Sequence, residues 1–153
     1  MARAIHRFKY EDQPGLAVPL GEALAEAARV LPLAEDTRLV PVPLHASRFR
    51  ARKYDQAALL AAAVGRHLGL EVAWDGLRRI KATRRQVGLS DAQRDANVAC
   101  AFEATGPLTG EHLVLVDDVV TTGATTRAAA GALRAAGASE VWVLVLARAT
   151  DAP

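Results

Sequence analysis

The chain has 153 residues, of which 51% are hydrophobic and 5% aromatic, and its formal net charge at pH 7 is +2. This length favours a single domain over residues 1–153, which buries about 70% of its unfolded surface. The single cysteine, Cys100, excludes an internal disulfide, and the four histidines have no metal-ligand spacing. The sequence shows neither a signal peptide nor an apolar run of the roughly 18 residues that a membrane helix needs, so we expect a cytoplasmic protein without membrane insertion.

The first half of the chain alternates helix and strand patterns. Residues 16–30 are rich in Ala and Leu with charged residues along one side, which predicts a helix. Leu39 to Val42 are expected to form a short strand. A second helix is predicted from an N-cap at Asp55 to about Leu68, with Gly69 as its stop and residues 70–74 as the next strand.

The second half continues the alternation. His112 to Val116 and Val141 to Leu146 are continuous apolar runs, typical of strands buried on both faces of a parallel sheet. Between them, small residues recur at helical spacing over 124–136, with Gly137 as the expected C-cap and Arg127 on the solvent-exposed face. These repeated units predict an α/β fold: an open, mainly parallel sheet with helices on both faces, and ligands outside the carboxyl ends of its strands.

The strongest functional signal is the segment from Val114 to Thr125. An apolar strand ends there in two adjacent carboxylates, Asp117 and Asp118, which can accept hydrogen bonds from vicinal hydroxyls. Amides at the start of the following helix can face an anion, and Gly123 allows the backbone to approach it closely. The loop that would hold this anion consists of Thr121, Thr122, Gly123, Ala124 and Thr125.

Three simpler or better-known motifs fit this segment less well. An ordinary capped turn does not require two acids at the end of a strand, because adjacent like charges repel there. The segment is not a Walker loop, since no lysine follows the glycine. A receiver-type phosphoacceptor also pairs acids at a strand end, but it does not need the Thr-Gly-Ala-Thr loop. The segment resembles the 5-phosphoribosyl-1-pyrophosphate (PRPP) binding motif of type I phosphoribosyltransferases.

Two further basic segments could complete a site of this kind. After the strand at 39–42, prolines stiffen a loop that could hold pyrophosphate or could be a solvated basic turn; it consists of Pro43, Leu44, His45, Ala46, Ser47 and Arg48. The stretch 78–90 is basic and hard to bury, which suits a mobile lid as well as an idle surface excursion. Its polar residues include Lys81, Arg84, Arg85 and Gln86, and Ser90 with Gln93 makes a possible capping box after them.

Taken together, nearly the whole chain resembles the ComF family, competence-associated proteins with a type I phosphoribosyltransferase domain. The resemblance is carried by several motifs in the family's order: His6 to Tyr10, Val40 to His45, Arg52 to Ala57, Gln86 to Ser90 with Arg94 and Asn97, and Val114 to Thr125.

The resemblance implies a role for each motif. Asp117 and Asp118 would contact ribose hydroxyls at the catalytic centre, and Thr121 to Thr125 would form the 5-phosphate loop. Residues 43–48 would form the pyrophosphate loop, and residues 81–94 the flexible loop over the site. The family also implies Mg²⁺ that bridges pyrophosphate and ribose, bound through PRPP.

The chain departs from the family in two places. Members often carry an N-terminal four-cysteine zinc module, whereas this sequence contains one cysteine. In the flexible loop, Thr83 to Gln86 replaces a stretch in which proline is expected.

Two functions remain open on the sequence alone. The first is a phosphoribosyltransferase that passes the phosphoribosyl group of PRPP to an unknown acceptor. The second is a non-catalytic, PRPP-responsive module that handles single-stranded DNA with the competence machinery during natural transformation. The arginine-rich stretches 48–53 and 78–85 suit either pyrophosphate or a nucleic-acid backbone. No pattern in the sequence specifies an oligomeric state.

Overall fold

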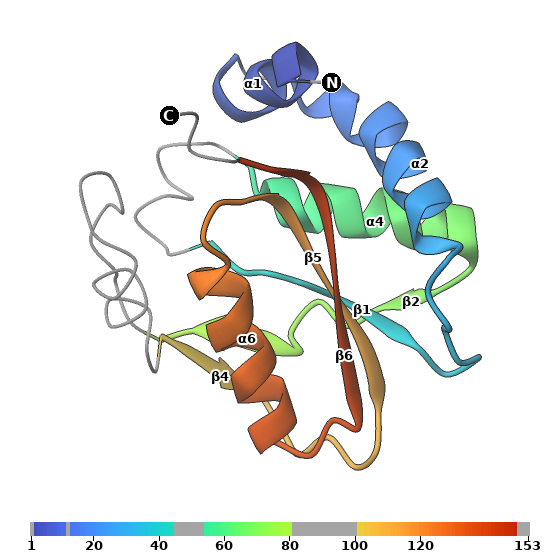
Figure 1. The fold of residues 1–153 in the computed structure, drawn as a ribbon, viewed down its shortest axis with the longest axis vertical. Coiled ribbons are helices and arrows are strands. Elements are labelled where there is room, and N and C mark those ends of the chain that lie inside the picture. Colours follow the sequence, from blue (N-terminus) through green and yellow to red (C-terminus); the bar gives the residue numbers. More distant parts are fainter. Residues whose placement is uncertain (1, 12, 45–53, 81–100, 150–153) are drawn as a thin grey trace.

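A four-stranded parallel sheet forms the centre of the molecule (Figure 1). The computed structural model describes residues 2–11, 13–44, 54–80 and 101–149. The strands lie in the order β2-β1-β5-β6, with parallel pairing between all neighbours. Their bounds are β1 (Arg38–Pro41), β2 (Glu71–Val72), β5 (His112–Val120) and β6 (Glu140–Arg148).

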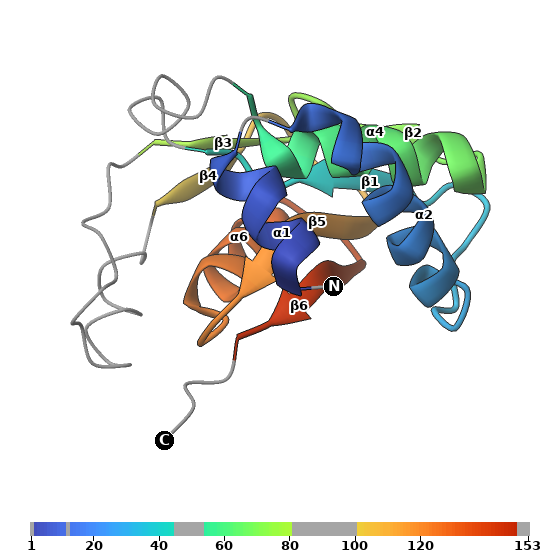
Figure 2. The same cartoon turned by 90° about the horizontal axis from the view of Figure 1, so that it is seen from above.

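Helices cover both faces of this sheet, as the sequence predicts (Figure 2). The helices α2 (Ala17–Ala28) and α4 (Gln56–Leu68) pack on one face, and α6 (Ala124–Ala135) packs on the other. The expected open, mainly parallel α/β sheet is therefore confirmed. A short 3-10 helix, η1 (Pro14–Leu16), leads into α2.

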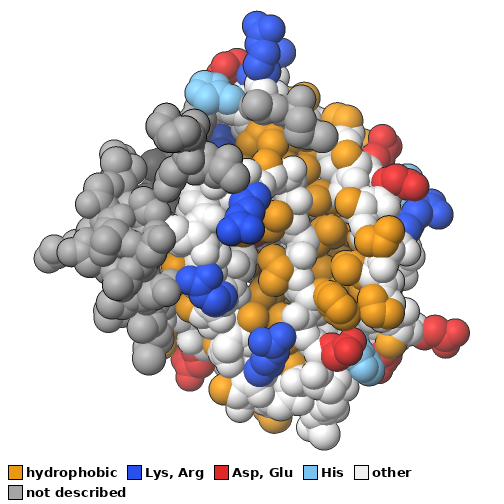
Figure 3. Space-filling model, in the orientation of Figure 1, with side chains coloured by type: hydrophobic (Ala, Val, Ile, Leu, Met, Phe, Trp, Pro, Cys, Tyr) orange, Lys and Arg blue, Asp and Glu red, His pale blue; other side chains and the backbone are white. Residues whose placement is uncertain are grey.

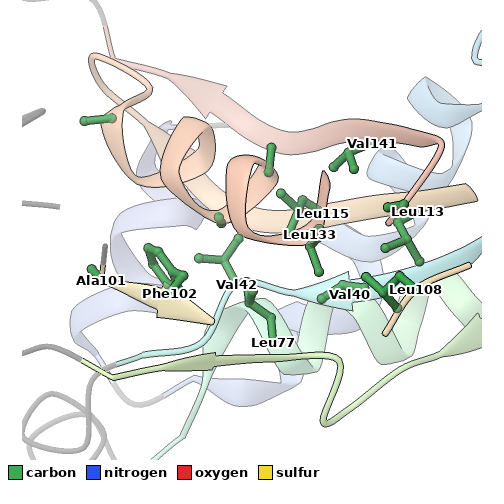
Figure 4. Packing of buried hydrophobic residues seen from close by; sticks show 14 residues of the cluster. Val40, Val42, Leu77, Ala101, Phe102, Leu108, Leu113, Leu115, Leu133 and Val141 are labelled. Carbon is green, nitrogen blue, oxygen red and sulfur yellow. The ribbon is translucent and has the colours of Figure 1, made fainter. Parts of the chain in front are cut away.

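The alternation of strand side chains divides the core into two layers. On β5, Leu113 and Leu115 contact the α6 side, whereas Val114 and Val116 contact the side of α2 and α4. Figure 4 shows the first layer, in which Leu133 of α6 lies over the strand residues. Burial on both faces explains why the sequence of β5 is a continuous apolar run.

Local capping signals hold α4 in place. The Asp55 side chain accepts a hydrogen bond from the Ala58 amide, with 3.1 Å between Oδ1 and N, which confirms it as the N-cap. Gly69 ends the helix in the left-handed conformation at φ +71°, as expected. At the end of α6, Ala136 is the C-cap and Gly137 follows it at φ +111°.

Three features were not predicted. The helix α1 (Ala2–Tyr10) lies above the end of the sheet at which β5 finishes (Figure 1). A separate antiparallel pair joins β3 (Leu77–Arg79) to β4 (Phe102–Ala104). The strand β5 also runs four residues beyond the expected end at Val116, so Asp117 and Asp118 belong to the strand itself.

The extension of β5 creates an open position beside it. The last residue pair between β1 and β5 joins Pro41 to Val116, and the Val42 amide donates to the Val116 carbonyl at 2.9 Å, whereas the Leu44 amide donates to Asp55 Oδ2 instead. The pairing of β5 with β6 continues to Val120. Within the described parts of the chain, the residues of β5 after Val116 therefore have a paired strand on the β6 side and none on the β1 side.

The outer strand β6 completes the sheet. Hydrophobic side chains gather over it on the face shown in Figure 3. Val143, on this strand, has 41% of its surface exposed.

Close packing of α2 on α4 depends on Gly21. A Cβ atom at this position would lie 2.3 Å from Cβ of Ala63, a contact that only backbone movement could relieve. We predict that Gly21→Ala lowers the free energy of unfolding by about 1–3 kcal/mol, because overpacking outweighs the gain in helix propensity. Gly131→Ala in α6, where the added Cβ would meet nothing within 4 Å beyond its chain neighbours and the backbone of its own helix, should instead stabilise by about 0.5–1 kcal/mol. Urea denaturation of both variants measures the difference; equal shifts would contradict the packing argument.

Candidate functional site

The acid pair lies at the open end of β5. Asp117 Oδ1 accepts the amide of Asp118 at 2.8 Å, and Asp118 Oδ1 accepts the amide of Val119 at 2.6 Å. Successive residues of a strand point to opposite faces, yet both acids line one cavity. This is possible because the cavity occupies the position beside β5 that β1 leaves open.

The environment of Asp117 disfavours its ionisation. Burial, followed by the negative charge of Asp118, raises the pKa of Asp117 to about 7, while the amide of Asp118 and the charge of Lys9 act in the opposite direction. Lys9 Nζ lies 3.1 Å from Asp118 Oδ1, and both side chains are largely removed from water. Asp55 adds a third carboxyl group to the cavity, and burial raises its pKa as well.

The predicted phosphate loop connects β5 to α6. Thr121, Gly123, Ala124 and Thr125 line the cavity together with the acid pair, and Thr122 does not. The Thr122 hydroxyl instead accepts a long hydrogen bond of 3.4 Å from the Ala124 amide. The loop therefore has one member that supports its turn and four that face the candidate site.

Gly123 acts through its backbone conformation. It is the N-cap residue of α6 and has φ +81°, a region that residues with a Cβ rarely adopt. An added Cβ would meet the flexible end of the Arg127 side chain at 3.0 Å. Glycine is thus required here for the left-handed turn. The sequence also predicts close approach of this backbone to an anion, which would concern a bound ligand.

Two residues of α6 brace this loop. The Thr126 hydroxyl donates to the carbonyl of Gly123 at 3.0 Å, and Arg127 Nη1 donates to the carbonyl of Thr122 at 2.7 Å. Arg127 is exposed, as expected, but it also supports the loop. These contacts fix the carbonyls of the turn at the start of α6.

The other predicted segments are described only in part. Pro43 and Leu44 line the cavity, and the Leu44 amide donates to Asp55 Oδ2 at 3.3 Å. The remaining residues of the predicted pyrophosphate loop and the predicted flexible loop lie outside the described residues: His45, Ala46, Ser47, Arg48, Lys81, Arg84, Arg85 and Gln86. The capping box at Ser90 and the residue Cys100 also lie outside them.

Sequence reasoning did not assign Lys9 or Asp55 to the cavity, and it included Arg79 only within the basic stretch 78–85. Lys9 enters the sequence patterns only as a member of the motif His6 to Tyr10, and Asp55 is predicted from them as a helix cap. Arg79 of β3 also lines the cavity, and its guanidinium lies 5.1 Å from the ring centroid of Phe102. The family motifs at residues 6–10 and 52–57 were the available signal for Lys9 and Asp55.

The fold and this acid-and-threonine site define a phosphoribosyltransferase domain. Residues 55–152 match the family described as "Phosphoribosyl transferase domain", and the chain belongs to that family. Among similar proteins is the DNA utilization protein YhgH of Salmonella typhi, 36% identical over 150 residues that cover 94% of this chain. Competence protein F of Haemophilus influenzae is 36% identical over 152 residues, or 95% of the chain. The chain spans 65% and 66% of the length of these two relatives, and the expected resemblance to competence-associated proteins is confirmed.

Solved structures show the same fold. The glutamine PRPP amidotransferase of B. subtilis, complexed with ADP and GMP, superimposes with a TM-score of 0.60 at 21% identity, covering 93% of this chain and 30% of that one. A protein from Thermus thermophilus has a TM-score of 0.53 at 21% identity, with coverage of 90% of this chain and 85% of the Thermus chain. In the parts of the chain that the structure describes, no helix combines the length and apolarity that a membrane span requires.

The raised pKa of Asp117 predicts a pH dependence of stability. The folded protein retains this proton up to a pH of about 7, whereas an unfolded aspartate releases it near its ordinary value of 3.8. Since the folded state binds more protons in this window, Asp117 makes the free energy of unfolding fall as the pH rises from about 4 to 7. Asp117→Asn removes the effect, so the variant should gain stability relative to the wild-type protein between pH 5 and 7. Denaturant titrations at several pH values measure this gain; a constant difference would contradict it.

Proposed function

We propose that the cavity at the end of β5 binds PRPP, with the ribose at the acid pair and the 5-phosphate in the loop that begins at Thr121. One observation carries this proposal: Asp117, Asp118 and four of the five predicted loop residues line a single cavity. Carboxylates are acceptors for ribose hydroxyls, and the start of α6 presents the positive end of a helix to the phosphate. Hydroxyl-binding groups beside a phosphate-binding loop suit a phosphorylated pentose.

The arrangement fits a magnesium ion that binds together with PRPP. Within the described residues, no group of three or more His, Cys, Asp or Glu side chains could hold a metal ion by itself. Magnesium retains several waters and is commonly bound through substrate phosphates with few protein ligands. Bound PRPP would carry the ion, which would supply charge neutralisation on the departing pyrophosphate.

The reaction that fits the site is a phosphoribosyl transfer. The bond from C1 of the ribose to pyrophosphate breaks as a nitrogen nucleophile forms a bond to C1 from the opposite face. The acid pair would fix the ribose through its hydroxyls while the loop fixes the 5-phosphate, so C1 is held in one orientation. Pro43 and Leu44, which begin the predicted pyrophosphate loop, line the same cavity, where charge on the leaving group can be stabilised.

The relatives support a second function for the chain, the handling of single-stranded DNA. One is named for DNA utilization and the other for competence. The arginines of the two basic sequence stretches provide charges that could follow a DNA backbone. This function could operate with or without turnover of PRPP.

For the PRPP site, we predict binding that depends on Mg²⁺ and on both acids. Asp117→Asn or Asp118→Asn should each weaken binding by roughly 1.5–3 kcal/mol, about tenfold to a hundredfold in Kd, because charged hydrogen bonds to the ribose are lost. Isothermal titration calorimetry with PRPP and Mg²⁺ measures the change. Ribose 5-phosphate alone should compete with PRPP, since it retains the hydroxyls and the 5-phosphate. Wild-type protein that ignores PRPP, or two variants with wild-type affinity, would refute the site.

For DNA handling, we predict binding with little sequence preference and strong salt dependence. The logarithm of affinity should fall with the logarithm of salt concentration by about 0.7 per neutralised phosphate. Replacing Arg84 and Arg85 together by Ala should flatten this slope by roughly one to two, because two cations no longer release counterions. Fluorescence anisotropy at several salt concentrations measures the slope, and Asp118→Asn is the control that should leave it unchanged. Absence of binding at low salt would rule out direct DNA handling by this chain.

A further inference from the structure

The helix α1 brings a positive charge to the acid pair from a distant part of the sequence. Its inward side is marked by Ile5 and Phe8, which are 6% and 0% exposed, whereas Arg7 lies on its exposed side. Lys9 is four residues after Ile5, one helical turn along the same side. The helix therefore directs Lys9 towards the sheet, and its side chain is only 17% exposed.

The position of Lys9 is fixed by the residue before it. The Phe8 ring packs against the Tyr54 ring with 5.8 Å between centroids, and the Tyr54 hydroxyl donates a short hydrogen bond to the Phe8 carbonyl. Tyr54 directly precedes Asp55, which caps α4 and lines the cavity. The end of α1 is thus attached to Tyr54, the residue next to Asp55, which lines the cavity.

The charge of Lys9 compensates part of the negative charge of this site. Three carboxyl groups line the cavity, at Asp55, Asp117 and Asp118, and they repel an incoming polyanion such as PRPP. Lys9 Nζ lies 3.1 Å from Asp118 Oδ1, where it offsets part of that charge. An ammonium group has three donors on a flexible stem, so it can contact Asp118 and a ligand oxygen at the same time.

A purely structural role accounts for this pair less well. Removing two charges from water costs about as much as their attraction returns, so a buried ion pair is weak evidence for a stabilising function. The Phe8 and Tyr54 contacts already attach α1 to the domain. Lys9 instead lines the cavity, where a ligand can reach its ammonium.

We propose that Lys9 is a ligand-binding residue of the phosphoribosyl site, which pairs with Asp118 in the free protein and donates to an anionic oxygen of the bound sugar phosphate. This proposal rests on the proposed function, because it names a further contact of the same ligand. It assigns to α1 a part of the site that lies outside the matched family segment, residues 55–152.

The test compares PRPP binding by four proteins in the presence of Mg²⁺. Lys9→Met should raise Kd about tenfold to a hundredfold, while Lys9→Arg, which keeps the charge, should stay within about threefold of wild type. Arg7→Met is the matched control: it removes one positive charge from the exposed side of α1, where Arg7 pairs with Glu11 at 3.3 Å, and should leave Kd unchanged. Calorimetry gives Kd, and thermal unfolding shows that each variant is folded; Lys9→Gln replaces Lys9→Met if that variant is unfolded.

A second comparison separates direct contact from an indirect effect. In an Asp118→Asn background, Lys9→Met should still weaken PRPP binding about tenfold, because the ligand contact is lost whether or not Asp118 is charged. No additional loss in this background would overturn the proposal, since Lys9 would then act only by orienting Asp118. Tighter binding by Lys9→Met would also overturn it and would make Lys9 a group that blocks the site. If the wild-type protein binds PRPP and Lys9→Met binds equally well, only the role of Lys9 fails; if the wild-type protein does not bind, the proposed function fails and this inference with it.

Discussion

The candidate site depends on the early end of β1 beside β5. Pro41 forms the last pair with Val116, the Val42 amide donates to the Val116 carbonyl at 2.9 Å, and the Leu44 amide then donates to Asp55 Oδ2 and not to β5. The strand β5 continues along β6 alone, so its last residues leave a space where a neighbouring strand would otherwise lie. Asp117 and Asp118 occupy this segment, and the loop to α6 begins directly after it. The point at which β1 leaves β5, between Val42 and Leu44, therefore determines where the sheet opens and which side chains line the opening.

The opening concentrates negative charge in a partly buried space. The surrounding structure limits the electrostatic cost of placing these carboxyl groups together. Three features reduce the effective charge of the acid pair. Asp117 retains its proton up to a pH of about 7, the Lys9 ammonium lies beside Asp118, and the backbone amides of Asp118 and Val119 donate to the carboxylates. Asp55 is held by the amides of Ala58 and Leu44. An acid that caps a helix thus also lines the site, so folding of α4 and formation of the cavity require the same side chain.

Sequence patterns predicted the parts of the fold that are determined locally. The Asp55 cap, the Gly69 stop and the apolar run of β5 each follow from neighbouring residues, and all three are present. The parts that were missed depend on distant contacts. Arg3, His6 and Arg7 make α1 polar, and only its packing near Tyr54 reveals the buried side. The pairing of β3 with β4 joins short segments separated by more than twenty residues, which no local period signals.

The same division applies to the site. The run from Asp117 to Thr125 is contiguous in sequence, so its chemistry could be predicted, although the support given by Thr126 and Arg127 could not. Lys9 comes from a helix more than a hundred residues away, and only the fold brings its ammonium to Asp118. In the proposed function, a phosphorylated sugar binds to hydroxyl-binding acids whose negative charge also repels its phosphates. A contiguous motif supplies the acids. The compensating cation, Lys9, comes from a distant segment that the fold brings to the end of the sheet.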